Sequence, residues 1–136
     1  MPEPHPILGL LNTPHQFSYE SGVTITRVEP ELARGVLAVN ENSHNPHGQV
    51  HGGALYTLAD TVAGCCACSK GGSCVTASSS MEFLRPAYGQ EIFCEATPKK
   101  MGKSLSVIQV TLTGDGRTIA TGTFSFFMLP APSEGA

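Results

Sequence analysis

Two short segments near the start of the chain carry the β-branched residues and alternating apolar positions that are typical of strands. They span residues 22–28 (GVTITRV) and 33–40 (ARGVLAVN) and are separated by the sequence EPEL. Valine, isoleucine and threonine favour extended backbone because their branched side chains pack well on a pleated surface. The short connection, which contains a proline, predicts that the two strands pair with each other.

The next segment has a helical period. Between residues 53 and 69, apolar side chains recur at intervals of three and four positions, at Leu55, Leu58, Ala59, Val62 and Cys66. This spacing places them on one face of a helix. The helix is expected to end near Lys70-Gly71-Gly72, because a cation and glycines are common at a helix C-terminus.

Four further strand candidates follow the helix, at residues 74–84, 90–98, 103–113 and 117–129. The last two are joined by Gly114-Asp115-Gly116, and Asp-Gly is a strong signal for a tight hairpin. One long helix among about five to six long strands favours the α+β class, with an antiparallel sheet that covers the helix.

The chain of 136 residues is expected to form a single domain. Residues 1–14 contain four prolines and predict an irregular arm, while residues 130–136 (PAPSEGA) predict a loose tail. Between these ends the sequence contains no linker, repeat or low-complexity tract.

Composition and charge narrow the function classes. A net charge of −3 gives no general attraction to nucleic acid or to anionic membranes. The N-terminus lacks the pattern of a signal peptide, and no apolar run approaches the roughly 18 residues of a membrane helix. The five cysteines are an odd number and are expected to be reduced thiols, which favours the cytoplasm.

The predicted helix contains a single charged side chain, Asp60. The positions three and four residues away hold Tyr56, Thr57, Ala63 and Gly64, so no cation on the same helix can pair with it. Burying an unpaired carboxylate costs several kcal/mol. Asp60 is therefore either a packing residue held by a strand hydroxyl or an arginine, or a reactive group.

The residues before the helix favour the reactive role. Asn45, Gly48, His51, Gly52 and Gly53 lead directly into its N-terminus, where backbone N–H groups are free and the helix dipole is positive. Glycines let a ligand oxygen approach those N–H groups closely. A carbonyl that becomes an oxyanion could be stabilised there, while Asp60 acts on a water molecule or on the carbonyl carbon.

These residues carry a resemblance to a known family. The pattern Asn45-x-x-Gly48-x-x-His51-Gly52-Gly53, followed by Ala59-Asp60, resembles the hotdog-fold acyl-CoA thioesterases, and most nearly their phenylacetate-pathway (PaaI-like) branch. MEFLRPA at 81–87 and Gly102-Lys103-Ser104-Leu105 are similar to two further motifs of that group. The resemblance implies a central helix wrapped by a curved antiparallel sheet, and dimers, often paired into tetramers, with each active site at a subunit interface.

The resemblance also implies roles for individual residues. Asp60 is expected to be the nucleophile or general base of thioester hydrolysis, and the Gly52 N–H to polarise the thioester carbonyl. His51 is expected to support that turn or the thiolate, and Asn45 to position the water or Asp60 of a second subunit. Thr76, on the strand after the helix, is expected to place a hydroxyl near the acid. No cofactor is expected, since coenzyme A is part of the substrate.

Two further sets of residues are candidates for substrate contacts. Four side chains among the strand turns could meet the phosphates of CoA: Arg85, Lys100, Lys103 and Ser104. Tyr56, Met81 and Phe83 could line an acyl pocket or could belong to the core. The identity of the acyl group stays open at this stage, as does the choice between CoA and carrier-protein thioesters.

Other interpretations are weaker. His44, His47 and His51 are spaced for a metal site only on a helix, which the surrounding prolines and glycines disfavour, and no CxxC pair is present. Nothing ties a particular cysteine to a histidine as a nucleophile. A hotdog hydratase usually pairs an acid with a histidine from another motif, and a non-catalytic acyl-CoA sensor usually needs an attached effector domain.

Overall fold

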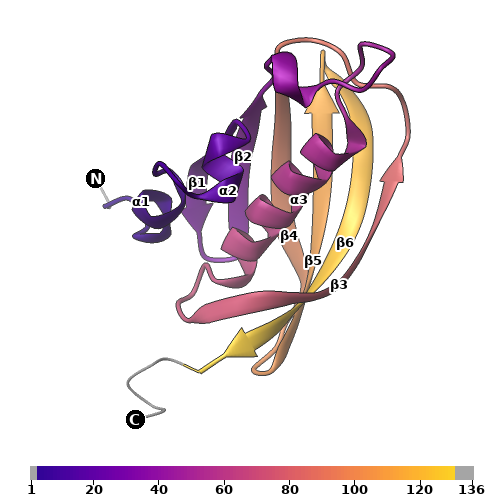
Figure 1. The fold of residues 1–136 in the computed structure, drawn as a ribbon. Coiled ribbons are helices and arrows are strands. Elements are labelled where there is room, and N and C mark those ends of the chain that lie inside the picture. The colour runs from indigo at the N-terminus through magenta and orange to yellow at the C-terminus, as the bar shows by residue number, and fades with distance from the viewer. Residues whose placement is uncertain (1–2, 131–136) are drawn as a thin grey trace.

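The computed structural model describes residues 3–130, in which a six-stranded antiparallel sheet curves around one long helix (Figure 1). The strands are β1 (Val23–Glu29), β2 (Leu32–Ala38), β3 (Ser73–Phe83), β4 (Glu91–Met101), β5 (Leu105–Gly114) and β6 (Arg117–Leu129). They lie in the order β1-β2-β4-β5-β6-β3, with every neighbouring pair antiparallel. The helix is α3 (Gly52–Ala67). The expected α+β class is confirmed.

The β5–β6 hairpin forms at the predicted turn. Gly114 pairs with Arg117, so the loop contains only Asp115 and Gly116. Both have positive φ, 51° and 74°, which is the backbone of a type I′ turn. The turn matches the twist of the flanking strands, and it fixes the register of β5 against β6.

Helix α3 packs its apolar face onto the sheet. Leu55, Leu58, Ala59, Val62 and Cys66 are all buried, as their spacing predicts. The helix lies very close to β2 at one point, because a Cβ added at Gly35 would come within 2.7 Å of Val62 Cγ2. A glycine at this strand position therefore sets how near the helix can approach the sheet.

The N-terminal segment differs from the irregular arm that its prolines predict. Within the predicted arm of residues 1–14 lies the short helix α1 (Ile7–Leu11), and a second short helix, α2 (Phe17–Glu20), follows it. Pro6 stands just before α1, where its fixed φ is compatible with a helix start, and Ile7, Leu8 and Leu11 pack against the core. Asn12 ties the segment to β1, since its side chain accepts from the Ile25 N–H and donates to the Ile25 carbonyl, each at 2.8 Å.

Three features at the ends of the elements complete the fold. A 3-10 turn (Glu41–Ser43) precedes the loop that leads to α3. Of the tail predicted at 130–136, residues 131–136 lie outside the described part of the chain. No helix within residues 3–130 is long and apolar enough to cross a membrane.

Candidate active site

Asp60 meets a hydroxyl from the neighbouring strand. Thr76 Oγ1, on β3, donates a hydrogen bond of 2.8 Å to Asp60 Oδ1, on α3. The contact expected between these two residues is therefore present. Within residues 3–130 Asp60 forms no salt bridge, so its charge is not neutralised by a lysine or arginine of the described chain.

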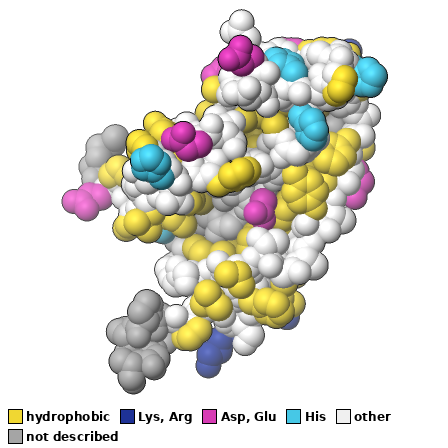
Figure 2. Space-filling view, viewed as in Figure 1, with side chains coloured by type: hydrophobic (Ala, Val, Ile, Leu, Met, Phe, Trp, Pro, Cys, Tyr) yellow, Lys and Arg dark blue, Asp and Glu magenta, His cyan; other side chains and the backbone are white. Residues whose placement is uncertain are grey.

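Asp60 and Thr76 both line a cavity of about 670 Å³. Its inner wall is a single stripe formed by residues 60, 61, 64 and 65 of α3 and by Cys68, which caps the C-terminus of the helix. Its outer wall is formed by α1 and α2, and the remaining sides by the start of β3 and by Phe126 of β6. Figure 2 shows this face, on which hydrophobic side chains surround a hollow with an acidic side chain at its centre.

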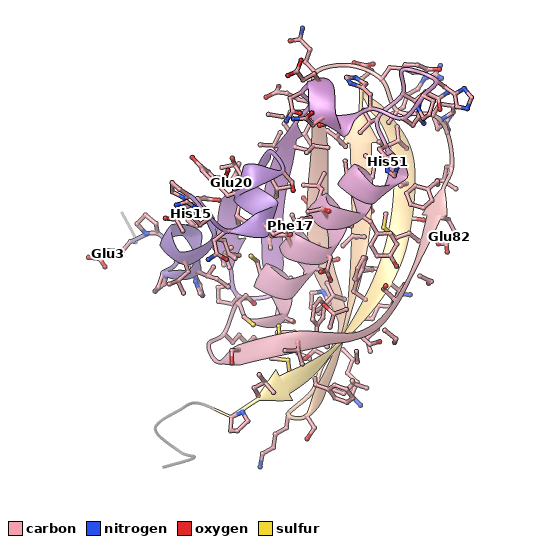
Figure 3. The ribbon with its side chains drawn as sticks, viewed as in Figure 1. Glu3, His15, Phe17, Glu20, His51 and Glu82 are labelled. Atoms are coloured by element: carbon pink, nitrogen blue, oxygen red, sulfur yellow. The ribbon has the colours of Figure 1, made fainter. Side chains whose placement is uncertain are left out.

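The start of α3 is capped by a histidine side chain. His51 Nδ1 accepts the Gly53 N–H at 2.8 Å, and His51 lies at the N-terminal end of the helix in Figure 3. The His51 carbonyl accepts the N–H groups of Ala54 and Leu55. Among the described residues no protein acceptor takes the Gly52 N–H, which leaves it available to a ligand at the positive end of the helix dipole.

Gly52 and Asp60 of one chain are too far apart to act on one carbonyl group. They are the first and ninth residues of the same helix. Eight residues at 1.5 Å each separate them by about 12 Å along the helix axis. A hydrogen bond to a carbonyl oxygen and an attack on its carbon must take place within about 3 Å of that group. One chain alone therefore does not unite the two predicted functional groups.

Asn45 organises its own loop. Its Oδ1 accepts the N–H groups of His47 (2.9 Å) and Gln49 (3.1 Å), and its Nδ2 donates to Gln49 Oε1 at 3.3 Å. The backbones of Asn45 and Gln49 are also hydrogen bonded to each other. Asn45 thus fixes the loop that delivers His51 to the helix start, and it is not in contact with Asp60 of the same chain.

The predicted acyl-pocket residues lie beside the cavity and do not line it. The Tyr56 hydroxyl is hydrogen bonded to Ser79 Oγ, and its ring packs edge-on against Phe124 with centroids 5.5 Å apart. Met81 is half-buried, and the Phe83 ring lies next to Gly52. These three side chains form a second apolar surface between α3 and β3, nearer to the helix N-terminus.

The candidate CoA-binding residues fall into two groups. Arg85 Nε donates to the Thr118 carbonyl at 2.9 Å, near the start of β6. Lys103 and Ser104 lie in the turn between β4 and β5, and the Ser104 carbonyl accepts the Met128 N–H near the end of β6. Ten strand residues between Thr118 and Met128 span roughly 33 Å. Arg85 therefore lies far from Lys103 and Ser104 in the folded chain, although they are close in the sequence.

All five cysteines are free thiols. Cys65, Cys68 and Cys74 line the cavity, and the sulfur atoms of Cys68 and Cys74 lie 3.0 Å apart. Burial raises the pKa of Cys65 to about 12 and that of Cys66 to about 11, so both are neutral at physiological pH. In the described part of the chain no three His, Cys, Asp or Glu side chains are arranged to hold a metal ion.

Sequence reasoning missed the N-terminal residues of the cavity. Ile7, Leu10 and Phe17 lie in its outer wall. The apolar spacing of Ile7, Leu8 and Leu11 after a proline was the available signal for a helix that covers apolar surface. No local signal shows that this helix lies opposite Asp60, because that contact joins segments about 50 residues apart.

Comparison with known families gives one clear match. Residues 47–121 match the model of the family described as "Thioesterase superfamily". This range covers more than half of the chain and includes Gly52, Asp60 and Thr76.

Two curated relatives are named as acyl-CoA thioesterases. The chain is 34% identical over 106 residues to acyl-coenzyme A thioesterase 13 of Mus musculus, covering 74% of this chain and 75% of the relative. It is 28% identical over 92 residues to acyl-coenzyme A thioesterase PaaI of Escherichia coli, covering 67% and 66%.

Solved structures show the same fold. The E. coli PaaI structure superimposes with a TM-score of 0.79 over 84% of each chain, at 23% identity. A Streptococcus mutans protein whose structure contains acetyl-CoA superimposes with a TM-score of 0.74 over 79% of this chain and 88% of that one, at 26% identity. The arrangement of helix and sheet is therefore the hotdog fold.

Proposed function

Because the chain belongs to the thioesterase superfamily, as a PaaI-like hotdog thioester hydrolase, we propose that it hydrolyses acyl-CoA thioesters to a free acid and CoA. The observation that carries the proposal is Asp60, held by Thr76 in a cavity and unpaired with any cation of the described chain. Within the described chain, a single hydrogen bond directs this carboxylate and no cation competes for its oxygens, so they are available to a substrate or a water molecule.

The proposed reaction uses Asp60 in one of two ways. As a general base, its carboxylate takes a proton from a water molecule whose oxygen attacks the thioester carbonyl carbon. The carbon–sulfur bond then breaks, and the CoA sulfur leaves with that proton. As a nucleophile, the carboxylate attacks the carbon itself and the carbon–sulfur bond breaks, which releases the CoA thiolate and leaves an anhydride. Water hydrolyses the anhydride to the free acid and the Asp60 carboxylate, and the thiolate takes up the released proton. Both routes place one Asp60 oxygen near 3 Å from the reacting atoms.

The Gly52 N–H is the proposed donor to the thioester carbonyl oxygen. A donor aimed at the oxygen that gains charge typically contributes a few kcal/mol to the rate. Since Gly52 and Asp60 of one helix are about 12 Å apart, we assign the Gly52 N–H to one subunit and Asp60 to another. Two copies of the chain are then needed for each complete site.

Strand β3 supports this self-association. It is an edge strand of eleven residues that pairs only with β6 within the described chain, and nearly all its side chains are exposed. Its apolar residues include Val75 and Phe83, which are 49% and 50% exposed. A long uncovered edge favours pairing with another strand. We propose a homodimer joined at this edge, or a homotetramer built from two such dimers.

The proposal extends to the CoA part of the substrate. Arg85 lies at one end of the sheet and Lys100, Lys103 and Ser104 lie at the other, so they are assigned to different contacts or to different subunits. The neighbour that contains acetyl-CoA supports a CoA thioester as the ligand class.

A hydrolysis assay tests the proposal. CoA release from a panel of acyl-CoAs is followed with a thiol reagent for the wild type, Asp60→Ala and Asp60→Asn. Loss of a proton-transfer group typically lowers the rate by about a hundredfold or more. Glu91→Gln is the matched control, because Glu91 is an exposed acid on the internal strand β4, away from both the cavity and the β3 edge; Glu82, on β3, points away from α3 but lies on the proposed dimer edge (Figure 3). Hydrolysis that survives in both Asp60 variants would rule out the role assigned to this residue.

The same samples separate catalysis from sensing. A wild type that is stabilised thermally by acyl-CoA but releases no CoA would support the non-catalytic sensor instead.

A further inference from the structure

The cavity beside Asp60 has a well-defined outer wall. α1 and α2 are held in place by the two Asn12–Ile25 hydrogen bonds, and His5 Nε2 donates to the Ser69 carbonyl at 3.1 Å. Phe17 points from α2 toward α3 and is 75% exposed (Figure 3). It borders both this cavity and a smaller hollow, of about 490 Å³, at the N-terminus of α3. The wall therefore encloses a space that begins at Asp60 and follows α3 toward its C-terminus.

The side chains that line the cavity disfavour a charged ligand group. Among the described residues of the lining, Asp60 is the only Asp, Glu, Lys or Arg side chain, and His5 donates its ring N–H to the Ser69 carbonyl. Apolar groups from α1, α2, α3 and β6 make up most of the remaining surface. The stripe from Asp60 to the helix C-cap Cys68 is about 12 Å long. Such a space suits an uncharged apolar chain, whereas a second carboxylate would lose its hydration there without gaining a cationic partner.

Gly64 lies one helical turn after Asp60 and lines the same stripe. A glycine in a helix interior costs about 1 kcal/mol relative to alanine. The local structure does not require it: its φ is not positive, and an added Cβ would make only ordinary contacts with the Phe126 ring, at 3.6 and 3.9 Å. What the missing side chain does provide is open space in the cavity, directly beyond the reactive acid.

We propose that the acyl group of the substrate is an uncharged apolar chain lying along α3 beyond Asp60, and that Gly64 sets how long that chain can be. This proposal rests on the proposed function, because it names the substrate class of the same site. Gly64 is here a specificity-determining residue and takes no part in the chemistry.

The test uses probes that bind without reacting. The dissociation constants of butyl, octyl and dodecyl thioethers of CoA are measured by calorimetry for the wild type, Gly64→Ala and Gly64→Leu. Gly9→Ala is the matched control: Gly9 is also a helical glycine, an added Cβ would meet nothing within 4 Å, and it does not line the cavity. Thermal unfolding of each variant is measured in parallel.

Gly64→Leu is expected to weaken the dodecyl probe by about tenfold or more while changing the butyl probe little, because each excluded methylene in an apolar pocket costs on the order of tenfold. The affinity of Gly64→Ala for the dodecyl probe is expected to lie between those of the wild type and Gly64→Leu. This variant should also unfold at a higher temperature than the wild type. It also carries the test if the leucine variant does not fold. An equal loss of affinity for all three probes, or no change in affinity for any of them, would overturn the proposal.

Hydrolysis rates for the matching acyl-CoAs separate this proposal from the proposed function. In one outcome, Gly64→Leu changes the chain-length preference for the probes, but the wild type hydrolyses no thioester. That result would support the position of the acyl chain in the cavity and contradict the thioesterase function. In the other outcome, the wild type hydrolyses thioesters and Gly64→Leu leaves the chain-length profile unchanged. That result would support the thioesterase function and contradict the role of Gly64.

Discussion

The hydroxyl of Thr76 donates a 2.8 Å hydrogen bond to the carboxylate of Asp60, joining the edge strand β3 to the central helix α3. This bond orients the only acid of the helix toward the cavity, and it links the reactive group to the strand that forms the proposed dimer contact. A shift in the position of the edge strand β3 can therefore alter the orientation of the Asp60 carboxylate through the Thr76 side chain.

Removing the Thr76 hydroxyl is expected to slow catalysis without unfolding the protein. A hydrogen bond to a charged group contributes roughly 1.5–3 kcal/mol, so Thr76→Val should lower kcat by about tenfold or more, while KM changes less. Thr76→Ser keeps the donor and should restore most of the rate. Steady-state kinetics on both variants provides the test, with Thr111→Val as an exposed strand threonine for comparison. A serine variant as slow as the valine variant would contradict the role of the hydroxyl.

The Gly52 N–H can be removed while the helix is kept. Gly52 is the first residue of α3, where proline is tolerated, and His51 has the extended backbone that a following proline prefers (φ −63°, ψ 137°). An added Cβ would come no closer than 3.8 Å to the Phe83 ring. Gly52→Pro should therefore lower kcat by about a hundredfold or more while the protein stays folded.

Gly52→Ala is the matched variant, because it adds the Cβ and keeps the N–H. It should retain nearly all of the activity. The measurement is kcat together with circular dichroism of both variants. If the alanine and proline variants lose activity to the same extent, the N–H is not the group that matters.

A site shared by two subunits predicts complementation. Asp60→Ala and Gly52→Pro should each be inactive alone, but a mixed dimer contains one site in which both groups are wild type. Random association of the two variants then gives about a quarter of the wild-type activity. Coexpression with two different affinity tags isolates the mixed dimer, whose activity is compared with that of each parent. A mixed dimer as inactive as its parents would place each site within one chain.

The buried thiols predict loss of stability in alkali. Burial raises the pKa of Cys65 to about 12 and of Cys66 to about 11, whereas a thiol in the unfolded chain ionises near pH 8.5. Above about pH 9 the unfolded chain therefore binds fewer protons than the folded protein, and the free energy of unfolding falls as pH rises. Urea denaturation between about pH 8 and 11 should show this decline, and Cys65→Ala/Cys66→Ala should reduce it. An equally steep decline in the double variant would assign it to other groups.

The elements of the fold were predictable from local patterns. The β-branched runs that became β1 and β2, the Asp115-Gly116 turn and the stripe of Leu55, Leu58 and Val62 each depend on residues close together in the sequence. The helix starts one residue earlier than the periodicity indicates, because His51 caps it from outside the apolar pattern.

Relations between distant segments were harder to predict. The contact of Thr76 with Asp60 was anticipated only through the family resemblance. Tyr56, Met81 and Phe83 were candidates either for an acyl pocket or for the core, yet the walls of the cavity come from α1, α2, the C-terminal half of α3, β3 and β6. Likewise, Arg85 and Lys103 are close in the sequence but lie at opposite ends of β6. Antiparallel strands of ten or more residues separate neighbours in sequence by the length of the sheet.

Hydrogen bonds of Asn12 and His5 hold the outer wall of the cavity in place, and both residues lie outside the range that matches the family. The reactive groups and the helix that carries them lie inside the matched range. Substitutions in α1 and α2 can therefore reshape the space for the acyl chain while Asp60, Thr76 and Gly52 keep their positions. In a chain organised this way, a new substrate preference can evolve in the first twenty residues without any change in the chemistry.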